Sequence, residues 1–261
     1  MEAVILAGGL GTRLSEETGL RPKPMVEICG KPILIHILEY LNKFGINNFI
    51  ICCGYKSSYI KDYFISKLMH QDDILVDFTT AEVSKLTKKN LNWKVRLIET
   101  GLDNLTGSRL KQALKYIKGE DFLFTYGDGL TNQNINSLIK SHKVSNKIAT
   151  VTAVQPPGRF GSLNLAQNNS EQFDVTSFSE KPIGDGSWIN GGYFILNKKI
   201  DKYLNEKPNC IWEKEPLSNI SKDNQLNAFL HYGFWKPMDT LKDKRELENL
   251  INKGKAPWLS Q

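Results

Sequence analysis

Short apolar runs alternate with amphipathic segments through the first half of the chain. The apolar runs have the length of single strands, and the segments between them repeat apolar residues every three or four positions, as helices packed on a core do. Strands are predicted at Glu2–Ala7, Phe49–Cys53, Trp93–Glu99, Phe122–Tyr126 and Ile148–Val154, and helices at Pro32–Phe44, Ser58–Met69, Gly107–Ile117 and Ile135–His142. This alternation indicates an α/β fold with a doubly wound, mainly parallel, Rossmann-like sheet.

The second half has a more mixed pattern. Strands are predicted at Val175–Ser179, Tyr193–Leu196 and Leu226–Leu230, and a terminal helix at Lys242–Asn252. No internal repeat or clear linker divides the chain, so residues 1–261 are expected to form one domain whose second half covers a substrate.

Composition places the chain among soluble globular proteins. Hydrophobic residues make up 40% and charged residues 24% of the sequence, and no stretch has the apolar length needed to span a membrane. The four cysteines lack metal-type spacing and are expected to be reduced thiols in a cytoplasmic protein. The net charge of +6 comes from scattered residues. We therefore expect neither nucleic acid nor membrane as a partner.

A glycine-rich loop directly follows the first predicted strand. Its residues are Leu6, Ala7, Gly8, Gly9, Leu10, Gly11, Thr12, Arg13 and Leu14. The glycines allow a tight turn that brings backbone N–H groups close to an anion, and Arg13 adds a planar cation suited to phosphate. The loop lacks the Gly-Lys-Ser/Thr of a P-loop, and Leu14 stands where a dinucleotide fingerprint has its third glycine. An ordinary glycine-rich turn is the alternative.

The segment Arg21-Pro22-Lys23-Pro24-Met25 favours the phosphate interpretation. Its two prolines stiffen the backbone on either side of Lys23, which limits where the ammonium group can lie. A lysine held in this way is expected to meet the same phosphates as the loop. Taken alone, the segment would suit a solvated loop lysine equally well.

Two acidic residues are candidate metal ligands. Asp128 follows the predicted strand Phe122–Tyr126 between two glycines, at the strand end where open α/β sheets bind ligands. Asp239 comes from an aromatic segment before the last predicted helix. Mg²⁺ is usually held by one or two carboxylates together with substrate phosphates, so such a pair is chemically sensible. The alternatives are a turn residue for Asp128 and a helix N-cap for Asp239.

Together these segments resemble the nucleotidyltransferases that activate sugar 1-phosphates, over almost the whole chain. The resemblance is carried by Leu6–Leu14, Arg21–Met25, Thr106–Leu110, Phe124–Gly129, Pro156–Gly161, Glu180–Pro182, Trp188–Gly192, Trp212–Leu217 and Gly233–Thr240. The segments Thr106–Leu110 and Pro156–Gly161 favour the cytidylyl branch of this family. Ala81–Asn90 and Asn168–Asp174 match no family pattern, and Cys29 stands where a small residue such as glycine is expected.

The resemblance implies roles for the residues that match its motifs. The implied nucleotide-binding residues are Leu6, Ala7, Gly8, Gly9, Leu10, Gly11, Thr12, Arg13, Thr106, Gly107, Arg109 and Gly127, and the implied sugar-binding residues are Glu180, Lys181, Asn190 and Gly191. Arg13, Lys23 and Lys181 are implied to be catalytic, and Asp128 and Asp239 to hold Mg²⁺ as the cofactor. Nucleotide binding is thereby expected in a half of about residues 1–130, and sugar binding in a half of about 131–261.

The implied reaction joins CTP to α-D-glucose 1-phosphate and gives CDP-glucose and pyrophosphate. The sugar phosphate attacks the α-phosphorus in line, without a covalent enzyme intermediate or a general base, while cations stabilise the developing charge. In this family the product supplies deoxysugar synthesis for cell-surface polysaccharide. We also expect a homo-oligomer, of a size that the sequence does not set.

Two alternatives stay open from the sequence. The enzyme would use UTP or dTTP if the contacts to one edge of the pyrimidine differed, and a single sequence does not show those contacts. A nucleotide-sugar sensor that had lost catalysis is the other alternative. The joint presence of Arg13, Lys23, Asp128 and Asp239 argues against a sensor, since a sensor has no need of the metal.

Overall fold

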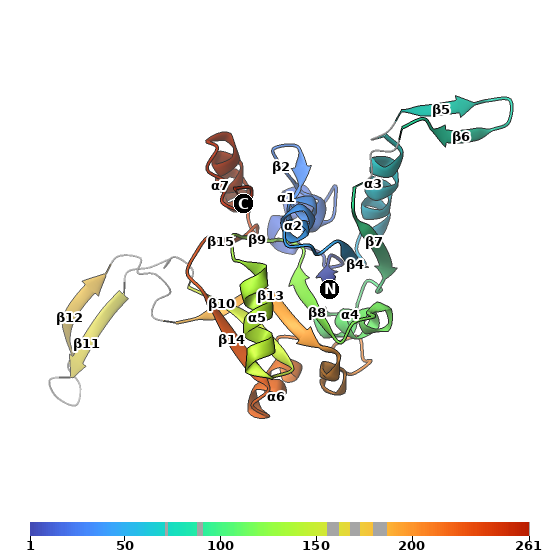
Figure 1. Cartoon of the computed structure of the whole chain (residues 1–261). Coiled ribbons are helices and arrows are strands. Elements are labelled where there is room, and N and C mark those ends of the chain that lie inside the picture. The colour runs from blue at the N-terminus through green and yellow to red at the C-terminus, as the bar shows by residue number, and fades with distance from the viewer. Residues whose placement is uncertain (71–72, 88–90, 156–161, 168–172, 180–186, 261) are drawn as a thin grey trace.

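A seven-stranded mixed sheet forms the centre of the molecule (Figure 1). The computed structural model describes residues 1–70, 73–87, 91–155, 162–167, 173–179 and 187–260. In spatial order the strands are β14 (Leu226–His231), β10 (Ala149–Val154), β13 (Ile189–Asn197), β8 (Asp121–Tyr126), β1 (Glu2–Leu6), β4 (Asn48–Cys53) and β7 (Lys94–Glu99). Only β13 is antiparallel to its neighbours. The predicted mainly parallel α/β sheet is confirmed.

Helices cover both faces of this sheet. They are α1 (Ser15–Thr18), α2 (Ile33–Asn42), α3 (Ser57–His70), α4 (Thr106–Ala113), α5 (Ile135–Ser145), α6 (Glu215–Lys222) and α7 (Leu241–Asn252). Alternate strand residues face opposite ways, so Ile5 and Ile51 pack with α2 and α5, whereas Val4 and Ile50 pack with α4 and α6. Every helix predicted from apolar periodicity is present. The predicted helix Gly107–Ile117 is α4 followed by one 3₁₀ turn, η3 (Leu114–Tyr116).

Small elements surround the main sheet. Four two-stranded pairings are formed by β2 (Glu27–Ile28) with β3 (Lys31–Pro32), β5 (Ile74–Asp77) with β6 (Glu82–Lys85), β9 (Gly129–Thr131) with β15 (Trp235–Pro237), and β11 (Ser162–Gln167) with β12 (Phe173–Ser179). Further 3₁₀ turns are η1 (Thr12–Leu14), η2 (Lys23–Met25) and η5 (Lys198–Tyr203). No described helix is long and apolar enough to cross a membrane.

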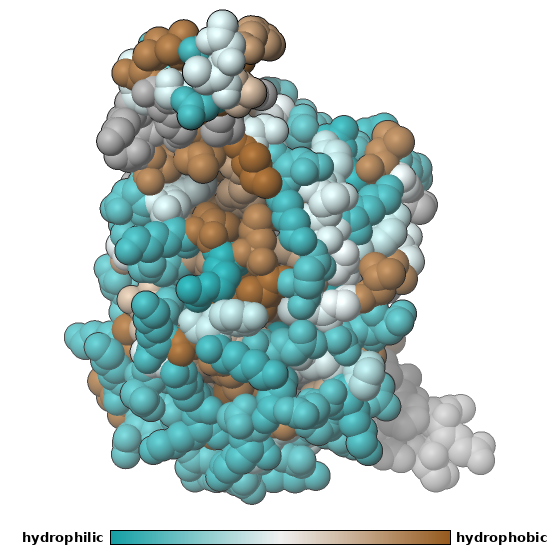
Figure 2. Space-filling model, turned by 90° about the vertical axis from the view of Figure 1, so that its right-hand side faces the viewer, coloured by the Kyte–Doolittle hydropathy of each residue, from teal (hydrophilic) through white to brown (hydrophobic). Residues whose placement is uncertain are grey.

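Two of these hairpins project from the body, β5–β6 on one side and β11–β12 on the other (Figure 1). Strand β6 lies within Ala81–Asn90, for which the apolar pattern predicted no element. Hydrophobic surface gathers on the β5–β6 hairpin, seen at the top of Figure 2, and continues below it on the body.

The sheet brings the glycine-rich loop and the Asp128 turn together. Strands β1 and β8 are parallel neighbours, with Leu6 opposite Tyr126, and the Gly127 N–H donates to the Leu6 carbonyl at 2.9 Å. The chain runs from β1 to β4 on one side, whereas β8 lies on the other side. Ligands of open α/β sheets bind at such a reversal of strand order, at the carboxyl ends of the strands.

Candidate active site

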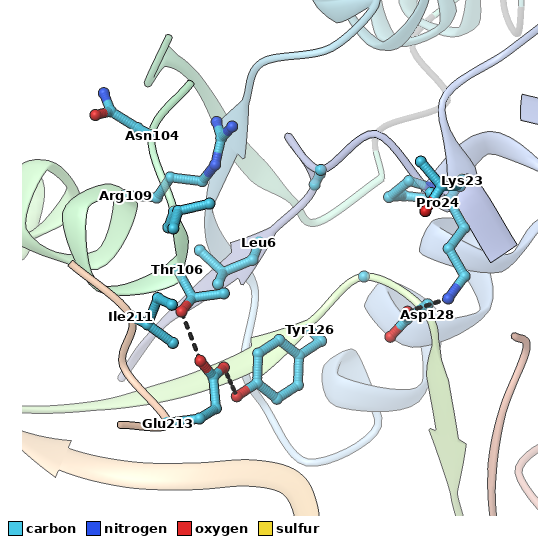
Figure 3. Close-up of a pocket in the computed structure, with 16 residues that line it drawn as sticks. Leu6, Lys23, Pro24, Asn104, Thr106, Arg109, Tyr126, Asp128, Ile211 and Glu213 are labelled. Carbon is cyan, nitrogen blue, oxygen red and sulfur yellow. Dashed lines mark hydrogen bonds and ion pairs between the residues drawn. The ribbon is translucent and has the colours of Figure 1, made fainter. Parts of the chain in front are cut away.

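A cavity of about 440 Å³ opens at the carboxyl ends of β1 and β8 (Figure 3). The predicted site residues that line it are Leu6, Ala7, Gly9, Gly11, Thr12, Lys23, Thr106, Arg109, Gly127 and Asp128. The remaining lining residues are Pro24, Asn104, Leu105, Tyr126, Ile211 and Glu213. The structure therefore brings together residues 6–12, 23–24, 104–109, 126–128 and 211–213, most of which are far apart in the sequence.

Glycines shape the floor of this cavity for steric reasons. Gly11 has a φ of +65°, and a Cβ atom there would lie 2.9 Å from the Lys23 Cβ. A Cβ at Gly127 would lie 2.8 Å from the Leu6 carbonyl oxygen. Side chains at these positions would push the loop away from β8 and Lys23.

Some predicted residues do not line the cavity. Gly8 and Leu10 belong to the loop but lie outside the lining, and Gly107 is packed against Cys210. The side chain of Arg13 and the residues Glu180 and Lys181 lie outside the described part of the structure.

Lys23 lies between the two predicted metal ligands. Its Nζ is 2.6 Å from Asp128 Oδ2 and 2.6 Å from Asp239 Oδ1, and the residue is only 7% exposed. Burial alone would lower the pKa of Lys23, but the charges and hydrogen bonds of both carboxylates outweigh burial and raise that pKa. The side chain is therefore held as a cation, at a point where two carboxylates converge.

A small sheet places Asp239 beside Asp128. Strand β15 pairs antiparallel with β9, with Pro237 opposite Gly129, and the Met238 N–H donates to the Asp128 carbonyl at 2.9 Å. The alternative of a helix-capping role for Asp239 is wrong, because Thr240 is the N-cap of α7 and forms a capping box with Asp243.

The guanidinium of Arg109 forms its hydrogen bonds with other residues of the protein. Its terminal nitrogens donate to the carbonyls of Gly8 at 2.9 Å, Cys53 at 3.1 Å and Leu102 at 3.1 Å, and to the Thr100 hydroxyl at 2.5 Å. Burial lowers the pKa of the guanidinium. Arg109 thus fixes the glycine-rich loop against the ends of β4 and β7, in addition to lining the cavity.

A second cavity, of about 350 Å³, adjoins the first. The predicted sugar-binding residues Asn190 and Gly191 line it together with Trp235, whose indole N–H donates to the Gly191 carbonyl at 2.7 Å. Both cavities share Tyr126, Asp128 and Glu213. The candidate metal ligand Asp128 therefore lies where two binding sites meet.

Glu213 was not predicted as a site residue. It accepts a hydrogen bond of 2.6 Å from the Thr106 hydroxyl and another from the Tyr126 phenol. Its segment, Trp212–Leu217, carried part of the family resemblance, and an acid next to a buried tryptophan was the available signal. Apolar periodicity alone does not distinguish this acid from a surface one.

The fold and the two joined cavities define a protein with two adjoining candidate binding sites at the carboxyl ends of a mainly parallel sheet. A family model described as nucleotidyl transferase matches residues 2–236. The chain belongs to this family.

Relatives of known name agree with this assignment. The chain is 49% identical over 259 residues to glucose-1-phosphate cytidylyltransferase of Salmonella typhimurium, covering 99% of this chain and 98% of the relative. It is 43% identical to the probable glucose-1-phosphate cytidylyltransferase of Bacillus subtilis, covering 99% of each. The solved structure of HddC from Yersinia pseudotuberculosis complexed with GMP-PN is similar at a TM-score of 0.68 and 29% identity, covering 96% of this chain and 99% of that one.

Proposed function

We propose that this protein transfers a cytidylyl group from CTP to α-D-glucose 1-phosphate and releases pyrophosphate. The observation that carries the proposal is the pair of joined cavities with Lys23, Asp128 and Asp239 where they meet. The close relatives named for this activity support the choice of substrates.

The larger cavity suits the nucleotide. The glycine-rich loop presents backbone N–H groups at the end of β1, and Lys23 supplies positive charge at one side of the cavity (Figure 3). Such groups neutralise charge as the α-phosphate is attacked and pyrophosphate leaves. The phosphate monoester of the sugar is already a nucleophile at neutral pH, so the site needs no general base.

Asp128 and Asp239 fit a Mg²⁺ ion. Both carboxylates contact the Lys23 ammonium, at 2.6 Å each, and two carboxylates with substrate phosphates are a usual ligand set for Mg²⁺. When bound, Mg²⁺ supplies Lewis-acid stabilisation of phosphate charge. Asp128, which lines both cavities, and Asp239, which lines the smaller one, would hold the ion, and Lys23 would orient the phosphates beside it.

The smaller cavity suits glucose 1-phosphate. Asn190 and Gly191 line it, and Trp235 offers an apolar wall of the kind on which sugar rings pack. We propose, from the family resemblance, that Glu180 binds a sugar hydroxyl and Lys181 the sugar phosphate. Arg13 is proposed to act with Lys23 on the phosphates of the nucleotide.

A pyrophosphate-release assay tests the function. The purified protein is supplied with Mg²⁺, glucose 1-phosphate and CTP, UTP, dTTP or ATP in turn, and then with CTP and other sugar 1-phosphates. We expect kcat/KM with CTP to be much higher than with dTTP or ATP. Equal turnover of dTTP would overturn the cytidylyl assignment and leave the broader family activity intact. No pyrophosphate release from any pair would overturn transferase activity itself.

We further propose that the protein is a homo-oligomer that associates through the β5–β6 hairpin. Ile74, Val76 and Val83 lie on one face of this hairpin, with Val76 directly opposite Val83, and Phe78 at its turn is 91% exposed. A lone two-stranded hairpin is marginally stable in water, and contiguous exposed apolar surface typically marks an interface. A second copy of this chain is the occupant that we propose.

A further inference from the structure

One carboxylate lies on the border between the two cavities, away from the cationic side. Glu213 lines both of them. Figure 3 shows Glu213 and Thr106 on one side of the larger cavity, Lys23 and Asp128 on the other, and Tyr126 between them. A carboxylate repels phosphate, because both are negative. Glu213 is therefore suited to the parts of the ligands that donate hydrogen bonds, which are hydroxyl or amino groups.

The carboxylate of Glu213 is held in one orientation. The Thr106 hydroxyl donates to its Oε2 at 2.6 Å, and the Tyr126 hydroxyl donates to its Oε1. The Thr106 hydroxyl oxygen in turn accepts a hydrogen bond from the backbone N–H of Trp212 at 2.9 Å. A carboxylate has about four acceptor positions, so each oxygen keeps capacity for one more donor. The two oxygens of Glu213 can thus accept hydrogen bonds from two donor groups on one ligand.

The loop that carries Glu213 is fastened to the first residues of α4. The Gly107 N–H donates to the Cys210 carbonyl at 2.9 Å, and a Cβ at Gly107 would lie 2.6 Å from the Cys210 sulfur. Trp212, beside Glu213, is fully buried. The packing of this loop therefore sets the backbone position of Glu213, whose exposed side chain is oriented by Thr106 and Tyr126.

We propose that Glu213 accepts hydrogen bonds from the vicinal 2′- and 3′-hydroxyls of the nucleotide's ribose and thereby selects ribonucleotides over deoxyribonucleotides. This inference rests on the proposed function, because it takes the larger cavity as the nucleotide site. In a nucleotide the ribose joins the phosphates to the base. With phosphates at Lys23 and Asp128, the ribose lies over Tyr126, within reach of Glu213 across the cavity. Acidic residues recognise ribose hydroxyls in the same way in other nucleotide-binding α/β sheets.

The test compares CTP with 2′-deoxy-CTP and 3′-deoxy-CTP in the wild type and in Glu213→Gln. Glutamine keeps the size of the side chain and removes its charge, which weakens it as an acceptor. We expect the wild type to prefer CTP by about tenfold or more, as loss of a hydrogen bond to a charged group predicts. In Glu213→Gln the ratio of kcat/KM values should fall by about tenfold, mainly through slower turnover of CTP. Glu206→Gln is the control, because Glu206 is exposed and lies in the same segment between η5 and α6. This variant should keep the wild-type ratio of kcat/KM values.

Three results would overturn the inference. The first is a wild type that uses 2′-deoxy-CTP and 3′-deoxy-CTP as well as it uses CTP. The second is a Glu213→Gln variant whose activities with CTP and with the deoxynucleotides fall by the same factor. The third is a Glu213→Gln variant that keeps the wild-type preference for CTP and has a raised KM for glucose 1-phosphate, which would assign the Glu213 carboxylate to the glucose hydroxyls. The proposed function fails separately, if the wild type releases no pyrophosphate from CTP and glucose 1-phosphate.

Discussion

Single side chains in this site have partners that determine what they do before any substrate binds. Lys23 was predicted from its flanking prolines to meet phosphates, and the structure adds that it neutralises Asp128 and Asp239. Arg109 was expected to bind the nucleotide, and the structure shows that it also fixes the loop that carries Gly8. In both cases the sequence identifies the residue, and the residues that it contacts determine its role.

Lys23 and a metal ion should compete for the same carboxylates. Replacing Lys23 with methionine removes the ammonium that contacts both Asp128 and Asp239. We expect Lys23→Met to bind Mn²⁺ in the absence of nucleotide about tenfold or more tightly than the wild type, since the two charge-assisted contacts of Lys23 no longer have to be broken. The measurement is the free Mn²⁺ signal by electron paramagnetic resonance during titration.

Lys31→Met is the matched control, because Lys31 pairs with Glu39 instead. It should bind Mn²⁺ as the wild type does. Asp128→Asn should weaken binding, since it removes one of the two charges. Unchanged Mn²⁺ affinity in Lys23→Met would show that the lysine and the metal do not share a site.

At the scale of elements, a short pairing outside the main sheet positions the candidate metal ligands. The β9–β15 pair brings Asp239 to Asp128, and the capping box of Thr240 starts α7 one residue later. Another such pair, β2–β3, has a two-residue turn formed by Cys29 and Gly30, with φ of +50° and +76°. Such hairpin turns need positive φ at both central residues, which favours glycine. This is the physical reason for the small residue expected at position 29.

Cys29→Gly should therefore stabilise the protein. A non-glycine residue in the left-handed region costs about 1–2 kcal/mol, whereas glycine loses about 0.4–1 kcal/mol more entropy on folding. The balance is a gain of about 0.5–1 kcal/mol in the free energy of unfolding. The thiol gives up only long contacts, 3.6 Å to Asn252 Oδ1 and 3.8 Å to the Glu248 carbonyl. Urea denaturation followed by circular dichroism measures the change.

Cys29→Ala separates backbone strain from thiol chemistry. It keeps the Cβ and removes the sulfur, so it should not raise the unfolding free energy. If alanine stabilised the protein as much as glycine, the strain argument would be wrong.

At the scale of the whole molecule, the β5–β6 hairpin predicts association. Val83 is 50% exposed on the apolar face of this hairpin, and a lysine there would bring a charge into the proposed interface. We expect the wild type to elute as a multiple of the 29.6 kDa chain and Val83→Lys to shift toward the monomer. Size-exclusion chromatography with light scattering measures the mass.

Val144→Lys is the control for this change. Val144 is 78% exposed on α5, away from the hairpin, so the variant should keep the wild-type mass. A monomeric wild type, or a Val83→Lys variant with unchanged mass, would contradict the proposed interface.

The sequence by itself determined the main sheet and the local parts of the site. Strands β1, β4, β8 and β10 were predicted because strands buried on both faces are nearly continuous apolar runs, whose signal is strong. Strand β7 was predicted from its alternation of apolar and polar residues. The glycine-rich loop and Lys23 were predicted because their chemistry is contained within a few consecutive residues. Strands β9, β15 and β6 were missed, since they have only three or four residues and little apolar periodicity.

Only the tertiary structure decided how distant residues combine. Asp128 and Asp239 are 111 positions apart in the numbering, and their convergence on Lys23 depends on β15 pairing with β9. Glu213 enters the site because its loop packs on Gly107, and Thr106 and Tyr126 then orient its carboxylate. Local patterns record propensity and burial along one segment. Contacts between segments follow from the packing of the whole chain, which no single stretch of sequence contains.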